Sequence, residues 1–270
     1  MPELPEVETI RSGLEPLLIH STIVDVCVRQ AQLRYRVPSD LAERVSGQRI
    51  TALQRRAKYL LLQVERGTIL IHLGMTGSLR YLSAAQAPER HDHLDFILDK
   101  GILRYRDPRR FGLVLWYSAT EPEHRLLDKL GPEPLGDTFT PDYLALRGEG
   151  SKRALKSFIM DNRVVVGVGN IYANEALFLA RIHPLRPAGE LSRAEWGTLH
   201  RHIIEVLQKA IKAGGTTIQD FVDGSGKPGY FQQQLLVYGR DKEPCPECGT
   251  ILQKQVIGQR SSWFCPACQS

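Results

Sequence analysis

The chain has 270 residues, with 35 lysines and arginines against 30 aspartates and glutamates, so its formal net charge is +5 and its isoelectric point is about 9.0. This length allows two or three domains with cores of their own, and the mild basic excess suits a polyanionic partner. No apolar run is long enough to span a bilayer, and the N-terminus lacks a basic start followed by an apolar core, so the sequence predicts neither a membrane protein nor a secreted one.

The chain begins Met-Pro-Glu-Leu-Pro-Glu-Val-Glu. Met1 precedes a small residue, so we expect an aminopeptidase to remove it and to leave Pro2 with a free secondary amine. An α-amino group has a pKa of about 8, so part of it is neutral and nucleophilic near pH 7, and its attack on a sugar C1′ would form an iminium. Glu3 is adjacent and could shuttle protons. The alternative is that these residues are an ordinary lead-in to a helix.

The next residues predict one helix and then a β-rich domain. Val7, Ile10, Leu14 and Leu17 recur at steps of three and four residues, as on one buried helix face, and Pro16 should end or kink that helix. Short apolar runs separated by glycine turns then predict a β-sandwich or barrel that ends near residue 130. The predicted strands are 22–29, 49–54, 59–64, 68–73, 94–98, 102–105 and 113–116.

Three features lie between these predicted strands, and none of them has an obvious function by itself. Lys58 follows two arginines directly before an apolar strand, where it could stand at the mouth of a cleft or in a solvated turn. Met75 lies in a glycine-flanked loop and could be core filler. His91 and His93 have the spacing of a metal site, although a strand with alternating polar residues would produce the same pattern.

The turn at residues 107–112, Asp-Pro-Arg-Arg-Phe-Gly, is more informative. It presents the guanidinium groups of Arg109 and Arg110 beside the ring of Phe111. An apolar wedge next to an arginine suits insertion into a stack of bases, and arginine also suits contacts with phosphate.

Residues 131–136 read as a linker, after which the composition predicts helices at 143–148, 152–162, 171–180, 193–213 and 218–222. A second basic cluster, between Arg147 and Arg163, includes Lys152 and Lys156. Asn170 follows a glycine-containing turn and is a candidate helix N-cap, where backbone amides could hold a phosphate or simply begin a helix. Residues 214–230 are rich in glycine and polar side chains, as in a surface connection or a mobile lid.

The strongest local signal is at the C-terminus. Cys245 and Cys248 form one Cys-x-x-Cys pair, and Cys265 and Cys268 form another. Four thiolates at this spacing predict a tetrahedral site for one structural Zn²⁺ ion, which substitutes for a core too small to hold itself together. The residues between the pairs alternate as a hairpin, 251–256 and 261–264, with Arg260 near its tip. Cys27 stands apart in a predicted strand, where we expect a buried apolar side chain.

Taken together, these motifs resemble bacterial formamidopyrimidine-DNA glycosylase, the base-excision enzyme for oxidised purines, over essentially the whole chain. The motifs that carry the resemblance are Pro2-Glu-Leu-Pro-Glu-Val-Glu-Thr, Arg55-Arg-Ala-Lys-Tyr-Leu, His72-Leu-Gly-Met, Asp107-Pro-Arg-Arg-Phe-Gly, Gly167-Val-Gly-Asn-Ile-Tyr, Lys227-Pro-Gly-Tyr-Phe and the terminal zinc finger. The family's fold is α+β and multidomain: an N-terminal β-sandwich, a helix–two-turn–helix domain and a zinc-finger hairpin. The implied boundaries are 1–130, 131–222, a loop at 223–235, and 236–270.

The resemblance implies four catalytic roles. Pro2 would be the nucleophile on C1′ and Glu3 its acid–base partner. Lys58 would contact phosphate and assist β-elimination. Arg260 would grip phosphates at the lesion and promote δ-elimination.

The resemblance also implies DNA contacts. Met75, Arg110 and Phe111 would fill the gap left by the extruded base. His91, Arg110 and Asn170 resemble positions that contact phosphate, and Lys156 resembles a basic residue near the damaged base. Ser151 and Lys152 are further implied contacts. Ser151 departs from the family pattern, because relatives often carry a basic residue just before the position of Lys152, so a phosphate contact there is expected to be moved or weakened.

These expectations describe a bifunctional glycosylase and lyase that acts on damaged double-stranded DNA as a cytoplasmic monomer associated with the nucleoid. Two alternatives stay open. A sister enzyme of the same fold acts on oxidised pyrimidines, but its start usually reads Pro-Glu-Gly-Pro, whereas this chain reads Pro-Glu-Leu-Pro. A non-catalytic zinc-finger protein that senses damaged DNA would form no covalent adduct through Pro2.

Overall fold

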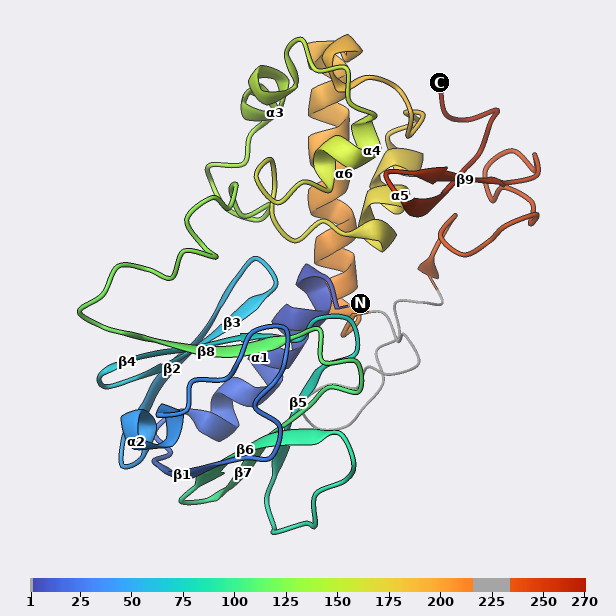
Figure 1. Ribbon diagram of the computed structural model, residues 1–270. Helices are drawn as coiled ribbons and strands as arrows, with labels where there is room; N and C mark the ends of the chain where they lie inside the picture. The colour runs from blue at the N-terminus through green and yellow to red at the C-terminus, as the bar shows by residue number, and fades with distance from the viewer. Residues whose placement is uncertain (1, 216–233) are drawn as a thin grey trace. The chain divides into compact units, whose positions relative to one another are not determined.

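The computed structural model describes residues 2–215 and 234–270, which fall into two compact units. The first unit contains residues 2–128 with 213–215, and the second contains residues 129–212 with 234–270 (Figure 1). Met1, the expected helix at 218–222 and most of the glycine-rich stretch at 214–230 lie outside the described residues.

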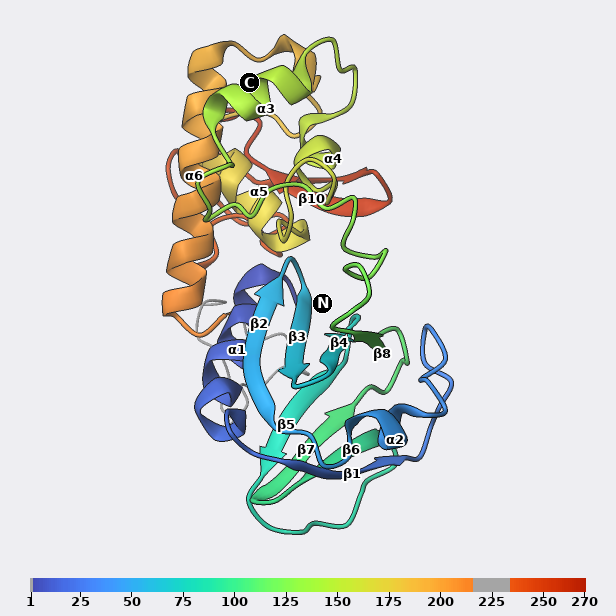
Figure 2. The same ribbon diagram turned by 90° about the vertical axis from the view of Figure 1, so that its left-hand side faces the viewer.

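The first unit is built on two four-stranded antiparallel sheets, seen in Figures 1 and 2. One sheet has the order β1 (Ile23–Val28), β6 (Asp92–Leu98), β7 (Gly101–Arg106) and β5 (Ser78–Leu82). The other has the order β2 (Ile50–Arg56), β3 (Tyr59–Val64), β4 (Gly67–His72) and β8 (Leu113–Ser118). Apolar side chains from both sheets and from the N-terminal helix share one core, as in a β-sandwich.

Helix α1 (Leu4–Leu18) packs against β2 and β5, which are edge strands of the two sheets. Its buried face includes Val7, Ile10 and Leu14, as the spacing predicts, whereas Leu17 is exposed. Pro16 lies inside the last turn, and the helix ends two residues later. The prediction that Pro16 ends the helix is therefore correct to within one turn.

The strand predictions are largely confirmed, but one strand and one short helix of this unit were not predicted, and the burial of one cysteine was predicted wrongly. β5 and the short helix α2 (Leu41–Val45) were not predicted. Cys27 is exposed on β1, contrary to the expectation of a buried side chain, because this strand buries only Ile23 and Val26. On a sheet with one face on the core, the remaining positions of such a strand face solvent.

The second unit combines helices with a C-terminal hairpin. Its helices are α3 (Pro141–Gly148), α4 (Leu155–Ile159), α5 (Asn170–Leu179), the 3₁₀ turn η1 (Ala188–Glu190) and α6 (Arg193–Lys212), and its strands are β9 (Gln253–Ile257) and β10 (Arg260–Phe264). Thr140 caps α3, since its Oγ1 accepts a hydrogen bond from the Tyr143 N–H at 3.1 Å. The β-sheets, the helical region and the hairpin confirm the predicted α+β class.

Helix α4 is shorter than the predicted 152–162 because the backbone before it pairs elsewhere. Leu155 donates to the Arg186 carbonyl at 2.8 Å, Ala188 donates to the Arg153 carbonyl at 2.9 Å, and Ala154 forms an isolated bridge with Pro187. These contacts hold residues 153 and 154 in extended backbone against 186–188, so the helix begins only at Leu155.

The hairpin packs on α5 through a small apolar cluster of Phe178, Val237, Leu252 and the zinc-finger cysteines Cys245 and Cys265. Within the described ranges, no helix has the length and apolar character needed to cross a membrane.

Candidate functional site

The start of α1 holds Pro2 and Glu3 in a fixed position. Both residues are buried, and Glu3 is only 2% exposed. The backbone N–H of Glu3 donates to Oε2 of Glu6 at 2.7 Å, and the Glu6 N–H faces the Glu3 side chain in return, which completes a capping box. The Glu3 side chain, next in sequence to Pro2, is thus held by the helix cap, so the helix lead-in and the candidate acid–base pair are the same feature.

Lys58 lies on the tight turn between β2 and β3. Arg55, at the end of β2, donates to Glu8 on α1 at 2.8 Å and to the Ala57 carbonyl at 2.9 Å, so the turn is tied to the helix. Ala57 adopts a left-handed φ of 55°, which reverses the chain and leaves Lys58 partly exposed at the tip. Pro2, Glu3 and Lys58 thus belong to one unit and to elements joined by an ion pair.

His72, at the end of β4, is held in its neutral form. Burial lowers its pKa to about 4, and the positive charges of Lys58 and Arg34 add to this effect. Its Nδ1 accepts a hydrogen bond from the Gly74 N–H at 2.9 Å, which puts the ring proton on Nε2. His72 therefore anchors the loop that carries Met75.

The loop of Met75 and the turn of Arg110 and Phe111 lie against each other. A Cβ added at Gly74 would come within 2.5 Å of the Gly112 nitrogen, and Gly74 has a φ of 65°. Phe111 is 45% exposed, and the Arg109 guanidinium lies 4.6 Å from the centre of its ring. This surface presents an apolar ring among positive charges, as the sequence predicts.

The histidines at 91 and 93 do not form a metal site with other side chains. His93 contacts the Asp107 carbonyl through Nε2 at 2.8 Å, while His91 is partly exposed just before β6. Among the described residues, the four C-terminal cysteines are the only group of three or more candidate ligands that could hold a metal ion. The interpretation of 91–93 as the start of a strand is the one that holds.

The second basic cluster is partly neutralised within itself. Asp161 accepts hydrogen bonds from Arg163 at 2.9 Å and from Arg153 at 3.1 Å, and these contacts, Arg163 first, lower its pKa to about 2. Lys152 is exposed on the segment before α4, and Ser151 beside it is partly exposed. Lys152 is therefore the better placed of the cluster's cations to meet a phosphate.

Lys156 differs from the other predicted contacts because its side chain is only 1% exposed. Its Nζ donates to the Ser261 carbonyl at 2.9 Å and to the Ser262 hydroxyl at 2.6 Å, both on β10. Ser262 in turn donates to the Arg260 carbonyl at 3.3 Å. Lys156 thus braces the hairpin strand that begins with Arg260.

Asn170 is the first residue of α5 rather than its cap, which is Gly169. Its side-chain oxygen is buried and has no hydrogen-bond partner anywhere in the described ranges. The oxygen and nitrogen of an asparagine amide are assigned from their surroundings, so a rotated amide would present an N–H group at the same place. A buried side-chain polar atom without a partner is rare, and it fits a group that pairs with a ligand.

The four cysteines fit a structural zinc ion. The Sγ atoms of Cys245 and Cys268 are 3.9 Å apart, those of Cys248 and Cys265 are 3.5 Å apart, and all four lie within 4.8 Å of one another. A tetrahedral site with Zn–S bonds of about 2.3 Å requires sulfur atoms about 3.8 Å apart. One Zn²⁺ ion held by four thiolates leaves no open coordination position, so its role is structural.

Arg260 begins β10 and is exposed. The turn before it uses left-handed backbone at Gly258, with φ 55°, and at Gln259, with φ 63°. A two-residue turn of this kind matches the twist of the flanking strands. The hairpin therefore presents Arg260 at its tip, while Lys156 holds the neighbouring Ser261 and Ser262 and the cysteine site lies at the base.

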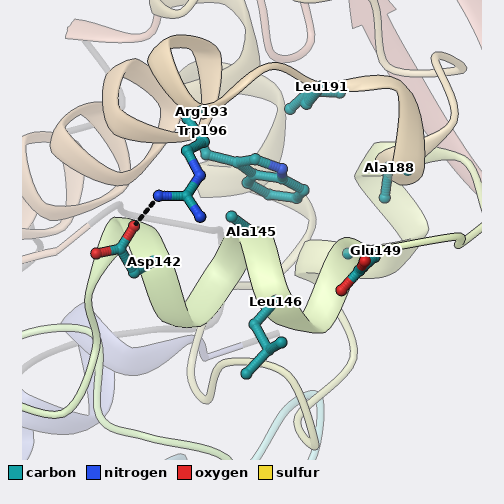
Figure 3. Close-up of a pocket in the computed structure, with 10 residues that line it drawn as sticks. Asp142, Ala145, Leu146, Glu149, Ala188, Leu191, Arg193 and Trp196 are labelled. Carbon is teal, nitrogen blue, oxygen red and sulfur yellow. Dashed lines mark ion pairs between the residues drawn. The ribbon is translucent and has the colours of Figure 1, made fainter.

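A separate pocket of about 490 Å³ lies between α3, η1 and α6 (Figure 3). Leu146 is 71% exposed beside it, Trp196 forms its floor, and the exposed pair Arg193–Asp142, 3.8 Å apart, stands at one side. None of the residues predicted from the sequence lines this pocket. We assign it no part in the chemistry.

Sequence reasoning overlooked two buried carboxylates. The Glu175 carboxylate on α5 accepts the backbone N–H groups of Leu236, Val237 and Tyr238 at 2.8–3.0 Å, and burial raises its pKa. Asp107 was noted only as the start of a turn, yet it is fully buried. The partners of Glu175 lie 61 to 63 positions away, so spacing along the chain carries no signal for them. Asp107 has partners within its own turn, but neither its burial nor its contact with Thr76, 31 positions away, can be seen in the sequence.

Family models match three consecutive regions of the chain. Residues 1–114 match the formamidopyrimidine-DNA glycosylase N-terminal domain, residues 130–222 match the formamidopyrimidine-DNA glycosylase H2TH domain, and residues 242–270 match a zinc finger found in FPG and IleRS. Among curated relatives, the formamidopyrimidine-DNA glycosylases of Stutzerimonas stutzeri and Neisseria meningitidis are 55% and 50% identical, each over the full length of both chains.

Solved structures agree. The MutM (FPG) protein of Thermus thermophilus has a TM-score of 0.90 at 40% identity, with 99% of this chain and 98% of that chain covered. A Lactococcus lactis FPG mutant in complex with Fapy-dG-containing DNA has a TM-score of 0.92 at 34% identity, with both chains fully covered. A complex of the Lactococcus lactis protein with DNA that contains an abasic site has a TM-score of 0.91, also at 34% identity, with 99% of each chain covered.

Proposed function

The chain belongs to the formamidopyrimidine-DNA glycosylase family, and from this premise we propose that it excises oxidised purines from duplex DNA and then cleaves the abasic strand. Its relatives are named as DNA glycosylases, and two of the solved neighbours are complexes with damaged DNA. The observation that carries the proposal is the start of α1, where Pro2 is buried and is followed directly by Glu3, a buried carboxylate held by the helix cap.

The proposed chemistry begins once Met1 has been removed. The lone pair of the Pro2 nitrogen attacks C1′ of the damaged nucleotide, the bond between C1′ and the base breaks, and the base leaves with a proton. The nitrogen gives up its own proton, the bond between C1′ and the ring oxygen O4′ then breaks, O4′ takes a proton, and a C1′=N⁺ iminium remains. The resulting iminium withdraws electrons from C2′, so a C2′ proton can be lost and the 3′ phosphate leaves by β-elimination. Glu3 lies next to the reacting nitrogen and is proposed to carry the protons.

Lys58 and Arg260 are proposed to handle the phosphates. Lys58, on the turn tied to α1 through Arg55 and Glu8, would bind a phosphate near the lesion and assist the first elimination. Arg260, at the tip of the zinc-stabilised hairpin, would bind the phosphate that departs in the second elimination, from C5′. A bidentate guanidinium stabilises a leaving phosphate well.

The damaged base must leave the helix before Pro2 can reach C1′, and this costs a few kcal/mol. We propose that Met75, Arg110 and Phe111 fill the vacated space. The exposed ring of Phe111, with the Arg109 guanidinium against it and Arg110 next in the chain, suits this role. His91, Arg110, Ser151, Lys152 and Asn170 are proposed to contact the DNA backbone, and the buried side-chain oxygen position of Asn170, which has no partner among the described residues, supports its assignment. Lys156 is proposed to act through the hairpin that it braces.

The test compares one protein before and after an N-terminal cut. A removable extension that leaves Pro2 as the first residue should give no borohydride-trapped adduct with 8-oxoguanine DNA while attached, and full trapping after its removal. Mass spectrometry should place the cross-link on Pro2. The same preparation is its own control, since only the state of the Pro2 nitrogen differs. Trapping that is equally strong with the extension attached, or a cross-link on Lys58, would refute the assignment.

The lesion decides between the remaining alternatives. Duplexes with 8-oxoguanine opposite cytosine should be cut much faster than duplexes with thymine glycol. The reverse preference would identify an enzyme for oxidised pyrimidines. Tight binding without any strand cut or adduct, in the Met1-free protein, would identify a non-catalytic sensor of damaged DNA.

A further inference from the structure

The loop that carries Met75 and the turn that carries Arg110 and Phe111 meet at one buried carboxylate, that of Asp107. The loop follows β4 and the turn follows β7, so the two are more than thirty positions apart in the sequence. Asp107 has no exposed surface, although the three residues that follow it are exposed.

Each oxygen of the carboxylate receives hydrogen bonds from a different group of donors. Oδ1 accepts from the Thr76 hydroxyl at 2.8 Å and from the Arg109 N–H at 3.3 Å. Oδ2 accepts from the Gly112 N–H at 2.9 Å and from the Tyr105 hydroxyl at 3.3 Å. Thr76 directly follows Met75, and Gly112 directly follows Phe111, so one side chain holds both.

The backbone of Asp107 is fixed as well. Its N–H donates to the His91 carbonyl at 3.1 Å, and its own carbonyl accepts from Arg110 at 3.2 Å and contacts Nε2 of His93 at 2.8 Å. Contacts with residues of β6 and of the segments next to β6 and β7 therefore fix the position of the carboxylate, and both loops are hydrogen-bonded to it.

The space around this point is filled. A Cβ at Gly112 would lie 2.0 Å from the Tyr105 hydroxyl and 2.3 Å from the His72 carbonyl. Arg110 adopts a φ of 55°, a backbone conformation that non-glycine residues rarely take, and the hydrogen bonds of Asp107 to the residues on either side of it hold it there. The loops cannot approach more closely, and Asp107 prevents them from separating.

We propose that Asp107 is a positioning residue that sets the spacing of Met75 relative to Arg110 and Phe111, and so determines how well these side chains fill the gap left by an extruded base. This inference rests on the proposed function of that trio. A displacement of about 1 Å in a positioning contact can lower a rate by up to about a hundredfold. Base extrusion from a duplex depends on this spacing, whereas chemistry on an unpaired sugar does not.

The experiment separates these two requirements with Thr76→Val, which removes the hydroxyl that links the loop to Asp107 while keeping the side-chain volume. Excision of 8-oxoguanine opposite cytosine should fall by about 10-fold to 100-fold. Cleavage of a single-stranded oligonucleotide with an abasic site should stay within about twofold of the wild type, since it has no stack to prop open. Thr76→Ser, which keeps the hydroxyl, is the matched control and should restore excision. Asp107→Asn, with one acceptor oxygen fewer, should show the same split.

A second readout follows the gap directly. A 2-aminopurine placed beside the lesion fluoresces when its stacking is lost, and this signal should be smaller and slower with Thr76→Val than with Thr76→Ser. Equal losses on both substrates, or no loss on either, would overturn the positioning role. A wild type that cuts neither substrate would instead refute the proposed function itself, so the two failures are distinguishable.

Discussion

The burial of the His72 side chain makes the stability of the folded protein depend on pH. Its folded pKa of about 4 lies below the usual value of 6.5, so the unfolded chain binds the additional proton between these two values. The stabilisation from neutral His72 is therefore complete above about pH 6.5 and is lost as the pH falls toward 4. We expect this one group to contribute about 3 kcal/mol to the decrease in the free energy of unfolding across that window.

The comparison that isolates this effect is with His72→Asn, whose side-chain oxygen can accept the Gly74 N–H but does not titrate. Chemical denaturation at a series of pH values should give curves that converge on acidification, since only the wild type loses the His72 contribution. The remaining histidines and carboxylates are common to both proteins. Parallel curves between pH 7 and pH 4 would contradict the prediction.

Which residues could be predicted from the sequence depends on how local their partners are. Glu3 and the four cysteines act through neighbours within a few positions or through a recognisable spacing, and the sequence points to them. Lys156 was predicted as a DNA contact, but its amine is directed to hairpin residues more than a hundred positions away. A charge that is satisfied by distant groups leaves no trace in its own segment. Asp107 was overlooked for another reason: most of its donors lie within its own turn, but its complete burial and its bond to Thr76 depend on the fold.

At the level of elements, strands with regular apolar patterns were predicted almost to their ends, as for β3 at Tyr59–Val64. The strand β5 was overlooked because Ser78–Leu82 includes Arg80 and follows directly on a glycine turn. Helix α4 was predicted too long because its composition is helical, while tertiary backbone pairing with residues 186–188 decides the conformation of its first part. Local propensity is overridden where another segment offers hydrogen bonds.

The hairpin of β9 and β10 depends on its metal. Its small core of five buried residues includes two of the zinc-binding cysteines, and binding of a structural Zn²⁺ can supply about 10 kcal/mol or more to folding. We expect a strong chelator to expose residues 242–270 to proteolysis while residues 2–128 keep their protection, as limited proteolysis with mass spectrometry would show.

Cysteine variants provide the matched pair for this prediction. Cys248→Ser should lower the zinc content well below one ion per chain, whereas Cys27→Ser, which changes the exposed cysteine on β1, should leave the content at one. An equal loss of zinc in both variants, or protease resistance of 242–270 after complete metal removal, would show that the ion does not hold the hairpin.

For the whole molecule, a net charge of +5 says little about where DNA binds. Each phosphate contact adds about −0.9 to the slope of log affinity against log salt concentration. Arg110→Gln should therefore make the slope shallower by about one unit. Fluorescence anisotropy with a duplex that carries an uncleavable tetrahydrofuran abasic analogue measures this without turnover.

Arg193→Gln removes the same charge from the rim of the pocket in Figure 3, where the side chain is 89% exposed and no contact with DNA is proposed. Its slope should match that of the wild type. If both variants change the slope equally, binding follows the overall charge of the protein rather than a contact at Arg110.

The C-terminal zinc finger could be taken for a segment that proteins exchange freely, since the matching finger is found in two kinds of protein. Its contacts with the helical region show that it is fitted to this chain. The ammonium of Lys156 donates to the Ser262 hydroxyl on the hairpin. The side-chain oxygen of Asn174 accepts the backbone N–H of Trp263 at 2.8 Å, and the side chain of Gln269 donates to the Ile182 carbonyl at 3.0 Å. A foreign finger grafted at residue 242 would leave the buried ammonium of Lys156 without its partner, unless the new finger supplied a hydroxyl at the position of Ser262. A buried charge without a partner costs several kcal/mol. We therefore expect natural exchange of this segment to be restricted to zinc fingers that already carry matching hydrogen-bonding groups at these positions.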